Sequence, residues 1–562
     1  MSGLGGLLYG IDIGIIDGAL PFIKKGLQIS EQQASFIVAA VLAGSAIASI
    51  VAGALADFLG RKLMMIISAL MFIASVFVIK SADAYSTLLI GRLVQGASGG
   101  VIAVVIPLYL AECLPSAKRG RGTALFQLLL TVGILLAGVI GAGFINEAKS
   151  AMDAAKAAKD TAAELAAANH AWRSMFLIVL APGALYLIGT GLVAESPRWL
   201  FRKGRTDAAK NALLKSRTPS EADVELSEMA VHNDGAAKTA SGTSHQGSIF
   251  QRKYVVPFII ACIILGCTQG TGINSILQYL TLILQKGGFT LTDAAMYGNA
   301  VKVTNIVVTI IAMILVDKMG RKFLLKLGTA GIVVSLAMGA AAFLSFESKR
   351  VDVLDKVKAE FRDNAISVPV TVDKLGPAAA DGTPMELNVL FGKVAIDPKT
   401  GQEHEVAEDT ASAFSNDKEP ILKLEGGQDN AGNTLKLVIK RATYGPIAPK
   451  AAGYAILGSL MLFIASFAVG PGVCVWLALS ELMPTRIRSV GMGIALVINQ
   501  GVSTTIAGAF LPSVGSHGYA SFFIFCGIST VIYFITAAFF MPETKGKTLE
   551  EIEEYFEGKK KA

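Results

Sequence analysis

Several side-chain amides lie within long apolar stretches of the chain. The candidate amides are Gln127, Gln269, Asn274, Gln278, Asn305, Asn499 and Gln500. One amide offers an oxygen acceptor and two N–H donors, which suits an uncharged ligand with several hydroxyl groups. Because an amide is costly inside a membrane unless it faces a cavity or another polar group, these positions are candidates for a binding site. The alternative for each is a hydrogen bond between neighbouring helices, worth about 1 kcal/mol.

Two charged residues stand at positions where a membrane would bury them. Asp12 lies in the middle of the first apolar stretch, and Arg92 opens the fourth. A lone charge at that depth is costly, so we expect the two to need partners. A nearby guanidinium favours the ionised carboxyl and burial favours the protonated one, so such a pair could bind and release a proton. The alternative is a static ion pair. Asp17 is expected to be more peripheral, near the outer end of the same stretch.

Composition indicates a membrane protein. Of 562 residues, 53% are hydrophobic and 17% are charged, whereas soluble domains carry about 25% charge. The 58 glycines also fit membrane helices. The five cysteines have no spacing typical of a metal site, so neither a metal nor another cofactor is expected. Disordered, fibrous and disulfide-rich secreted proteins are excluded, and an ordinary soluble enzyme is disfavoured.

Twelve apolar stretches are long enough to cross a bilayer, since a spanning helix needs about 20 residues. They fall near residues 3–23, 34–56, 63–82, 86–112, 123–145, 173–193, 255–285, 293–316, 323–346, 451–480, 489–512 and 519–541. The first lacks a basic n-region, so we interpret it as a retained helix and not as a signal peptide. An even number of spans places both termini on one side. Residues 146–172, rich in alanine, are expected to form a short helical loop.

The two halves of the chain repeat the same motifs. Asp57-Phe-Leu-Gly-Arg-Lys follows the second span and Asp317-Lys-Met-Gly-Arg-Lys the eighth, while a Glu stands seven residues before an Arg in Glu112–Arg119 and Glu481–Arg488. Arg61 and Glu112 are 51 positions apart, and Arg321 and Glu481 are 160 apart. The difference matches a polar insert in the second half. Parallel repeats of six helices are a transporter architecture.

Charge distribution predicts the orientation. Twelve cations in short loops fall on one side, which the positive-inside rule makes the cytoplasm. They are Arg61, Lys62, Lys118, Arg119, Arg121, Arg198, Arg202, Lys203, Arg321, Lys322, Arg486 and Arg488. The insert, with 17 acidic and 14 basic residues, then lies outside. Topology accounts for the net charge of +7, so nucleic-acid binding is not expected.

Taken together, these motifs resemble the sugar porter family of the major facilitator superfamily. The most specific are Glu195-Ser-Pro-Arg-Trp-Leu, Pro542-Glu543-Thr-Lys-Gly and Gln269-Gly-Thr-Gly-Ile-Asn274. The resemblance covers almost the whole chain outside 347–450. It implies an all-α membrane protein in which twelve helices form two six-helix bundles. Family members move monosaccharides or polyols by facilitated diffusion or by proton symport.

The resemblance also implies roles for individual residues. Gln127, Gln269, Asn274, Asn305 and Asn499 match sugar-contacting positions, and Trp476 matches a tryptophan that stacks on the sugar. Gln278, Tyr279 and Gln500 are further candidates. The chain departs from the family at Thr268, where many members have Gln, and at Gln278, where an aromatic is common. The sugar itself is therefore not identified.

Asp12 and Arg92 match the pair found in proton-coupled members, and the facilitative members commonly lack that Asp. A gate on the cytoplasmic side is expected to pair the two halves in the outward-facing state. Its members are Arg61, Glu112, Arg119, Glu195, Arg198, Arg321, Glu481, Arg488 and Glu543.

The predicted organisation has six parts. Residues 1–194 form the first bundle, 195–254 a cytoplasmic linker with short helices, and 255–346 the first part of the second bundle. Residues 347–450 form a β-rich extracytoplasmic insert, 451–541 the rest of the second bundle, and 542–562 a cytoplasmic tail.

The leading hypothesis is a proton-coupled sugar or polyol symporter, a monomer in the plasma or inner membrane with both termini cytoplasmic. The alternatives are a uniporter of the same fold and a transporter-like sugar sensor. No catalytic constellation is recognised, so an enzyme is not expected.

Overall fold

A computed structural model describes residues 2–114, 116–227, 229–230, 251–376, 384–396, 403–415, 420–426, 435–483, 487–545, 551–552 and 555–556. Within these ranges the side chains of residues 2, 116–124, 317, 372, 396, 403–408, 476–481 and 488–490 are outside the description.

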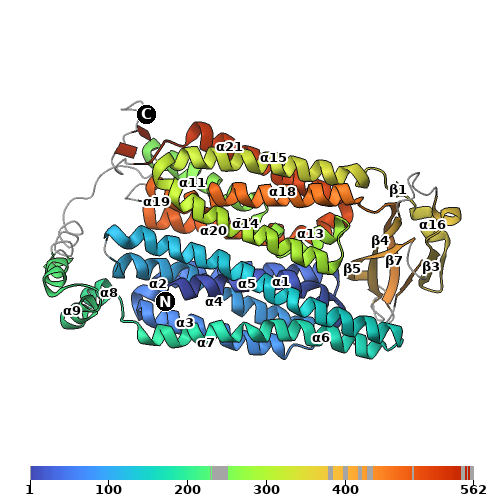
Figure 1. Cartoon of the computed structure of the whole chain (residues 1–562), viewed down its shortest axis with the longest axis horizontal. Coiled ribbons are helices and arrows are strands. Elements are labelled where there is room, and N and C mark those ends of the chain that lie inside the picture. Colours follow the sequence, from blue (N-terminus) through green and yellow to red (C-terminus); the bar gives the residue numbers. More distant parts are fainter. Residues whose placement is uncertain are drawn as a thin grey trace.

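Two bundles of long helices lie side by side (Figure 1). The N-terminal bundle consists of α1 (Ser2–Leu27), α2 (Glu31–Leu59), α3 (Arg61–Lys80), α4 (Tyr85–Cys113), α5 (Ser116–Ala157), α6 (Thr161–Ile178) and α7 (Leu180–Leu192). The C-terminal bundle consists of α11 (Arg252–Gly270), α12 (Ile273–Gln278), α13 (Leu280–Lys286), α14 (Leu291–Met319), α15 (Arg321–Glu347), α18 (Lys450–Val469), α19 (Pro471–Leu482), α20 (Arg488–His517), α21 (Tyr519–Ile535) and the π-helix η1 (Thr536–Phe540). In the described residues, twelve helical stretches are long and apolar enough to span a membrane, which confirms the predicted number.

The two ends of this helical body differ. Short helices α8 (Pro197–Arg202) and α9 (Thr206–Leu214) lie at one end, called here the linker end. A β-rich domain lies at the opposite end, called here the insert end, on the right of Figure 1. The long helices run between these two ends, so the position of each polar side chain can be described by its distance from the linker end or the insert end.

A glycine stripe holds α1 against α5. Gly6, Gly10, Gly14 and Gly18 recur every four residues and therefore share one helix face. A methyl group on Gly10 would lie 1.9 Å from the Leu130 carbonyl oxygen, and one on Gly14 would lie 2.9 Å from the Ile134 oxygen. The two backbones thus approach at a distance that no larger residue permits, as small residues allow between membrane helices.

Two predicted spans are interrupted. The seventh is divided into α11, α12 and α13, with Gly272 at φ +82° between the first two pieces. The tenth is divided at Gly470, where α18 ends and Pro471 begins α19. These breaks free backbone groups, and membrane proteins tolerate them only where the protein or a cavity surrounds them.

Residues 146–172, expected to form a short helical loop, are mostly helical but belong to two long helices. Helix α5 continues to Ala157 and α6 begins at Thr161, with Asp160 accepting the Ala163 N–H as the N-cap. Alanine is the strongest helix former, so the stretch is helical except at residues 158–160, where Lys159 has φ +55°.

Residues 351–446 contain two antiparallel sheets. The larger has the strand order β1 (Val351–Asp352), β7 (Leu435–Pro446), β4 (Met385–Ile396) and β5 (Glu403–Phe414). The smaller has the order β2 (Phe361–Arg362), β3 (Ala365–Pro369) and β6 (Ile421–Glu425). Short helices α16 (Leu354–Ala359) and α17 (Val372–Leu375) accompany them. Leu387, Val389, Ile366 and Leu437 contribute to a separate hydrophobic core.

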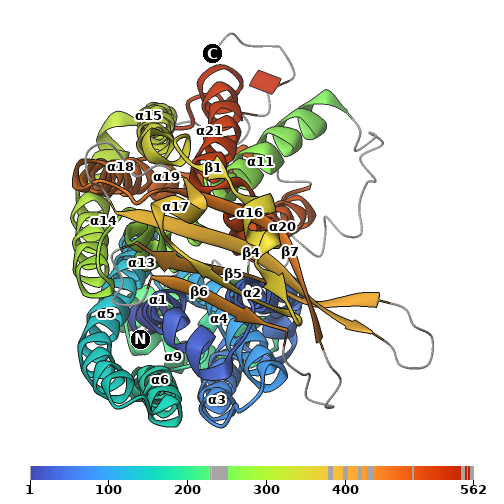
Figure 2. The same ribbon diagram turned by 90° about the vertical axis from the view of Figure 1, so that its right-hand side faces the viewer.

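This β domain touches both bundles. Figure 2, viewed from the insert end, shows its strands lying across the two. Toward the C-terminal bundle, Glu386 accepts hydrogen bonds from Lys286 at 2.6 Å and from Arg350. Toward the N-terminal bundle, the Thr410 hydroxyl donates to Glu31 at 2.9 Å.

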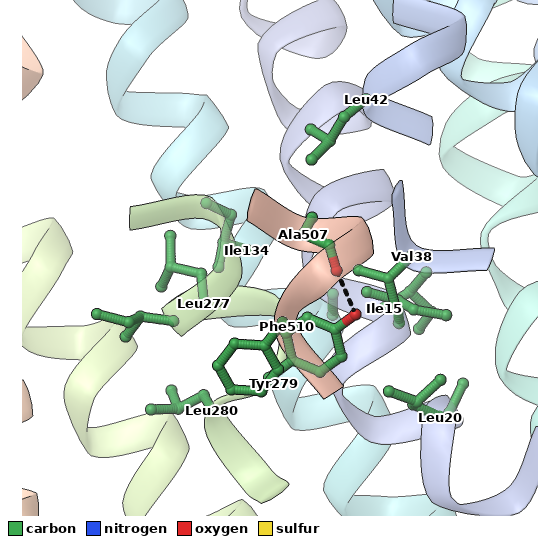
Figure 3. Packing of buried hydrophobic residues seen from close by; sticks show 14 of the residues in the cluster. Ile15, Leu20, Val38, Leu42, Ile134, Leu277, Tyr279, Leu280, Ala507 and Phe510 are labelled. Atoms are coloured by element: carbon green, nitrogen blue, oxygen red, sulfur yellow. Dashed lines mark hydrogen bonds between the residues drawn. The ribbon is translucent and has the colours of Figure 1, made fainter. Parts of the chain in front are cut away.

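Near the insert end the bundles also pack directly on each other. Tyr279 stacks on Phe510 within the C-terminal bundle, with ring centroids 4.2 Å apart, and its hydroxyl lies 3.4 Å from Ser35 Oγ of α2 in the N-terminal bundle. The same Ser35 oxygen accepts the Leu511 N–H of α20 at 3.1 Å. Ile15 and Val38 of the N-terminal bundle lie in the same cluster (Figure 3). The bundles are therefore closed against each other on this side.

Candidate functional site

Three of the predicted amides form one hydrogen-bonded chain at the break in the seventh span. Asn274 Nδ2 donates to Gln269 Oε1 at 2.9 Å, and Gln269 Nε2 donates to Asn499 Oδ1 at 3.3 Å. Asn499 in turn donates to the Leu265 carbonyl at 2.9 Å. The chain connects α11, α12 and α20. It exists because Gly272 turns the backbone between Gln269 and Asn274.

Ser503 belongs to this cluster and was not predicted. Its hydroxyl oxygen accepts a hydrogen bond from Asn274 Nδ2 at 2.8 Å. It follows Asn499 by four residues on α20, so helical spacing alone puts both on one face. This four-residue spacing from Asn499 is the sequence feature that could have identified Ser503 as part of the site.

Gln269 and Asn274 are half-buried, whereas Asn499 is 1% exposed. Gln269 and Asn274 can therefore replace the hydrogen bond between them with hydrogen bonds to a ligand. Asn499 is buried and is positioned to orient the Gln269 side chain. The arrangement offers donors and acceptors together, as recognition of hydroxyl groups requires.

The other predicted amides come from four different helices, α5, α12, α14 and α20. Gln127 is half-buried on α5, Asn305 is 8% exposed on α14, and Gln500 is half-buried on α20. Gln278 is 1% exposed, and its Nε2 has no hydrogen-bond partner within the described residues. None of them joins the Gln269 chain by a hydrogen bond that the structure records.

Tyr279 does not offer a free hydroxyl. Its side chain is fully buried between the bundles and its hydroxyl donates to Ala507. In this conformation the residue closes the interface and contacts no open space. The Trp476 side chain lies outside the described part of the chain, so its predicted stacking role stays a prediction.

The predicted proton-coupling pair is buried in the N-terminal bundle. Arg92 Nη1 lies 3.3 Å from Asp12 Oδ1, and the two side chains are 0% and 1% exposed. Arg92 also donates to Gln95 Oε1 at 2.8 Å, a partner that the sequence analysis did not identify. Asp12 Oδ2 and Arg92 Nη2 have no hydrogen-bond partner in the described residues. The pair is thus held by one long contact, where a guanidinium and a carboxylate can make two.

A second buried ion pair was missed. Lys302 of α14 lies 2.8 Å from Asp17 Oδ2, with the side chains 2% and 3% exposed. The expectation that Asp17 is peripheral is wrong, because the C-terminal bundle covers it. The signal was a lysine in the middle of the eighth span, a rare residue at such depth.

The linker-end charges that the structure describes make contacts within their own halves. Arg61, 1% exposed, pairs with Glu112 at 2.8 Å and with Asp57 at 2.7 Å. The Glu195 carboxylate accepts the Arg61 and Lys62 backbone N–H groups at the start of α3. Negative charge stabilises a helix N-terminus, so Glu195 acts as a cap.

Glu543 repeats this arrangement in the second half. Its carboxylate accepts the Arg321 and Lys322 backbone N–H groups at the start of α15. Arg198 is exposed. The side chains of Arg119, Glu481 and Arg488 are outside the described part of the chain, so the expected pairing across the halves stays a prediction. In the described residues, no group of three or more His, Cys, Asp or Glu side chains could hold a metal ion.

The sequence matches the family described as "Sugar (and other) transporter" over residues 1–357 and 433–556. The match leaves out residues 358–432, and those of them that the structure describes lie in the β domain. A facilitated glucose transporter, member 12 of solute carrier family 2 from Xenopus laevis, is 27% identical, with 98% of this chain and 88% of the relative covered. The galactose-proton symporter of Escherichia coli is 26% identical, with 98% and 92% covered.

Solved structures share the fold. The inward-open xylose transporter XylE from Escherichia coli superposes with a TM-score of 0.66 at 21% identity, covering 99% of this chain and 98% of that chain. A partially occluded inward-open form of the same transporter gives 0.66 at 19% identity, covering 97% and 98%.

Proposed function

This chain belongs to the Sugar (and other) transporter family of the major facilitator superfamily, and on that premise we propose that it is a proton-coupled symporter of a monosaccharide or polyol. That it is a multi-pass membrane sugar transporter, and not an enzyme, follows from the family and the twelve spans. The coupling ion, the class of sugar and the membrane are our proposals. We place the protein in the plasma or inner membrane with the linker end in the cytoplasm.

The observation that carries the proton coupling is the Asp12–Arg92 pair. Asp12 is 1% exposed and is joined to Arg92 by a single contact of 3.3 Å, while its Oδ2 has no partner among the described residues. Burial favours the protonated carboxyl and Arg92 favours the ionised one, so a modest structural change can move the balance. Protonation of Asp12 weakens its attraction to Arg92 and lets the halves rearrange. The names of two relatives, a galactose-proton symporter and a proton myo-inositol cotransporter, support this proposal.

The sugar site is proposed between the bundles. Gln269, Asn274 and Asn499 would bind hydroxyl groups from the C-terminal bundle, and Gln127 would reach the sugar from α5. Asn305, Gln278, Gln500 and Trp476 are proposed as further contacts. Since the bundles close on each other at the insert end, sugar in this conformation would exchange with the cytoplasmic side. Alternating access would then open the insert end while the linker-end charges, including Arg119, Glu481 and Arg488, pair across the halves.

Asp12→Asn tests the coupling. In proteoliposomes with an imposed pH gradient, the variant should lose sugar accumulation but keep counterflow exchange, because the amide cannot bind and release the proton. Asp83→Asn is the matched control, since Asp83 pairs with Arg173 while its side chain is 88% exposed. Undiminished accumulation by Asp12→Asn would refute proton coupling through this residue.

A uniporter of the same fold is the second candidate, favoured by the facilitated glucose transporter among the relatives. A uniporter carries sugar down its gradient and does not concentrate it under any pH gradient. Wild-type protein that equilibrates sugar but never accumulates it would establish this alternative.

A further inference from the structure

We propose that Asp17 and Lys302 form the outer gate of the transport cycle, an ion pair that joins the two bundles in the closed state and separates when the insert end opens. This inference rests on the proposed alternating-access transport. Asp17 lies on α1 of the N-terminal bundle and Lys302 on α14 of the C-terminal bundle. Their contact of 2.8 Å therefore bridges the surfaces that must part.

The pair is held on both sides of the interface. Asp17 Oδ1 accepts the Thr281 backbone N–H at 2.7 Å, which adds a second bond from the C-terminal bundle. One turn before Lys302, Asn299 Nδ2 donates to the Gly138 carbonyl of α5 at 3.3 Å. Opening at this level would break all three contacts together.

The N-terminal side of the gate is mechanically fixed. Gly18 follows Asp17 directly, and a methyl group on Gly18 would lie 3.1 Å from the Gly141 Cα of α5. Helix α1 therefore carries Asp17 as part of the N-terminal bundle. Because α1 moves together with the rest of the N-terminal bundle, a relative movement of the two bundles changes the Asp17–Lys302 distance directly.

The gate also touches the segments that carry the predicted sugar contacts. Thr281 lies three residues after Gln278, and Lys302 lies three residues before Asn305 on α14. Residues three apart on a helix share a face, so Lys302 and Asn305 are neighbours. A sugar bound to Asn305 or to residues of α12 can therefore shift Lys302 or Thr281. In this way sugar binding would affect whether the Asp17–Lys302 ion pair stays closed.

Electrostatics predict what single substitutions do. In the closed state both charges are nearly fully removed from solvent, and removing one partner leaves the other uncompensated. Opening the insert end admits water, which hydrates the remaining charge. Asp17→Asn should therefore disfavour the closed state because Lys302 is left charged. Removing both charges eliminates that penalty, so Asp17→Asn/Lys302→Gln should return toward wild type.

The test measures the separation of the bundles directly. Spin labels at Ala151→Cys and Ser348→Cys, both exposed positions near the insert end, report it by double electron–electron resonance. The background has the five native cysteines replaced by serine. Asp17→Asn should raise the ratio of open to closed distances at least tenfold, and the double variant should reverse most of that shift. Asp83→Asn, which breaks an ion pair within one bundle, should leave the distribution unchanged.

Lys302→Gln repeats the test from the other bundle if Asp17→Asn does not fold. Distance distributions of the single variants that superpose on wild type would overturn the proposal, and so would a double variant as strongly shifted as the singles. The measurement needs no sugar. If no sugar flux were found, the transport function would be refuted, but the measured distances would still show whether Asp17 and Lys302 hold the insert end closed.

Discussion

Glu386 anchors the β domain to the C-terminal bundle, and its neutralisation should loosen that domain. The residue lies near the start of β4 and is 3% exposed. One carboxylate oxygen accepts from Lys286 at 2.6 Å and the other accepts from Arg350. Lys286 and Arg350 flank the domain from α13 and from the end of α15, so Glu386→Gln removes the charge that holds both.

The magnitude follows from the pKa of Glu386. Burial raises this pKa, but the charges of Lys286 and Arg350 outweigh burial and lower it from 4.5 to about 2. One pKa unit corresponds to about 1.4 kcal/mol, so the ionised carboxylate contributes about 3 kcal/mol at neutral pH. Since the pKa is lower in the folded state, the contribution is complete above about pH 4.5 and is lost as the pH falls toward 2.

Hydrogen–deuterium exchange measures the effect. About 3 kcal/mol corresponds to a more than hundredfold faster exchange of the β4 and β7 amides in Glu386→Gln at pH 7. The difference from wild type should shrink below pH 4.5. Glu425→Gln, on the exposed end of β6, is the control and should exchange like wild type. A change of less than about fivefold, or a difference that persists undiminished at low pH, would refute the reasoning.

Two further predictions concern packing and the sugar site. Gly10→Ala should lower the melting temperature of the detergent-solubilised protein, because its methyl group would lie 1.9 Å from the Leu130 carbonyl oxygen, whereas Gly143→Ala, with nothing within 4 Å, should not. Asn274→Ala should raise the Kd for the sugar about fivefold in a ligand-dependent melting assay, since the proposed hydrogen bond from this amide to the sugar, worth about 1 kcal/mol, is lost. Thr505→Ala, on the exposed face of α20, should bind like wild type, and an unaltered Kd for Asn274→Ala would remove that residue from the site.

Sequence reasoning was sufficient for the number of spans because length and hydropathy determine which segments can cross a bilayer. It did not predict how far the membrane helices extend. Residues 146–172 were expected to form a short helical loop, and the long helices α5 and α6 run through most of this stretch. The left-handed turn at Gly272 divides the seventh span, and a methyl group there would lie 2.8 Å from Cys526 Sγ of α21, a tertiary contact that the local sequence does not reveal.

The candidate site shows the same limit. That Gln269 and Asn499 are polar residues in membrane helices is evident from sequence, but their hydrogen bond depends on how α11 crosses α20. Lys302 is a charged residue within an apolar span, but its sequence position does not reveal that Asp17 of the other bundle faces it. The ion pair between them requires the closed arrangement of two bundles far apart in sequence.

The glycine stripe on α1 has a consequence for the proposed coupling of proton and sugar. Helix α1 carries Asp12 and α5 carries Gln127, and the glycine stripe lets the backbones of these two helices pack in direct contact. Sliding by about 3 Å, half of the four-residue repeat, would move the glycines away from the carbonyl oxygens and bring larger side chains against them. The separation between the Asp12 carboxyl and the Gln127 amide is therefore constant within the N-terminal bundle. In the proposed symport, proton binding can then influence sugar binding only through movement of the C-terminal bundle.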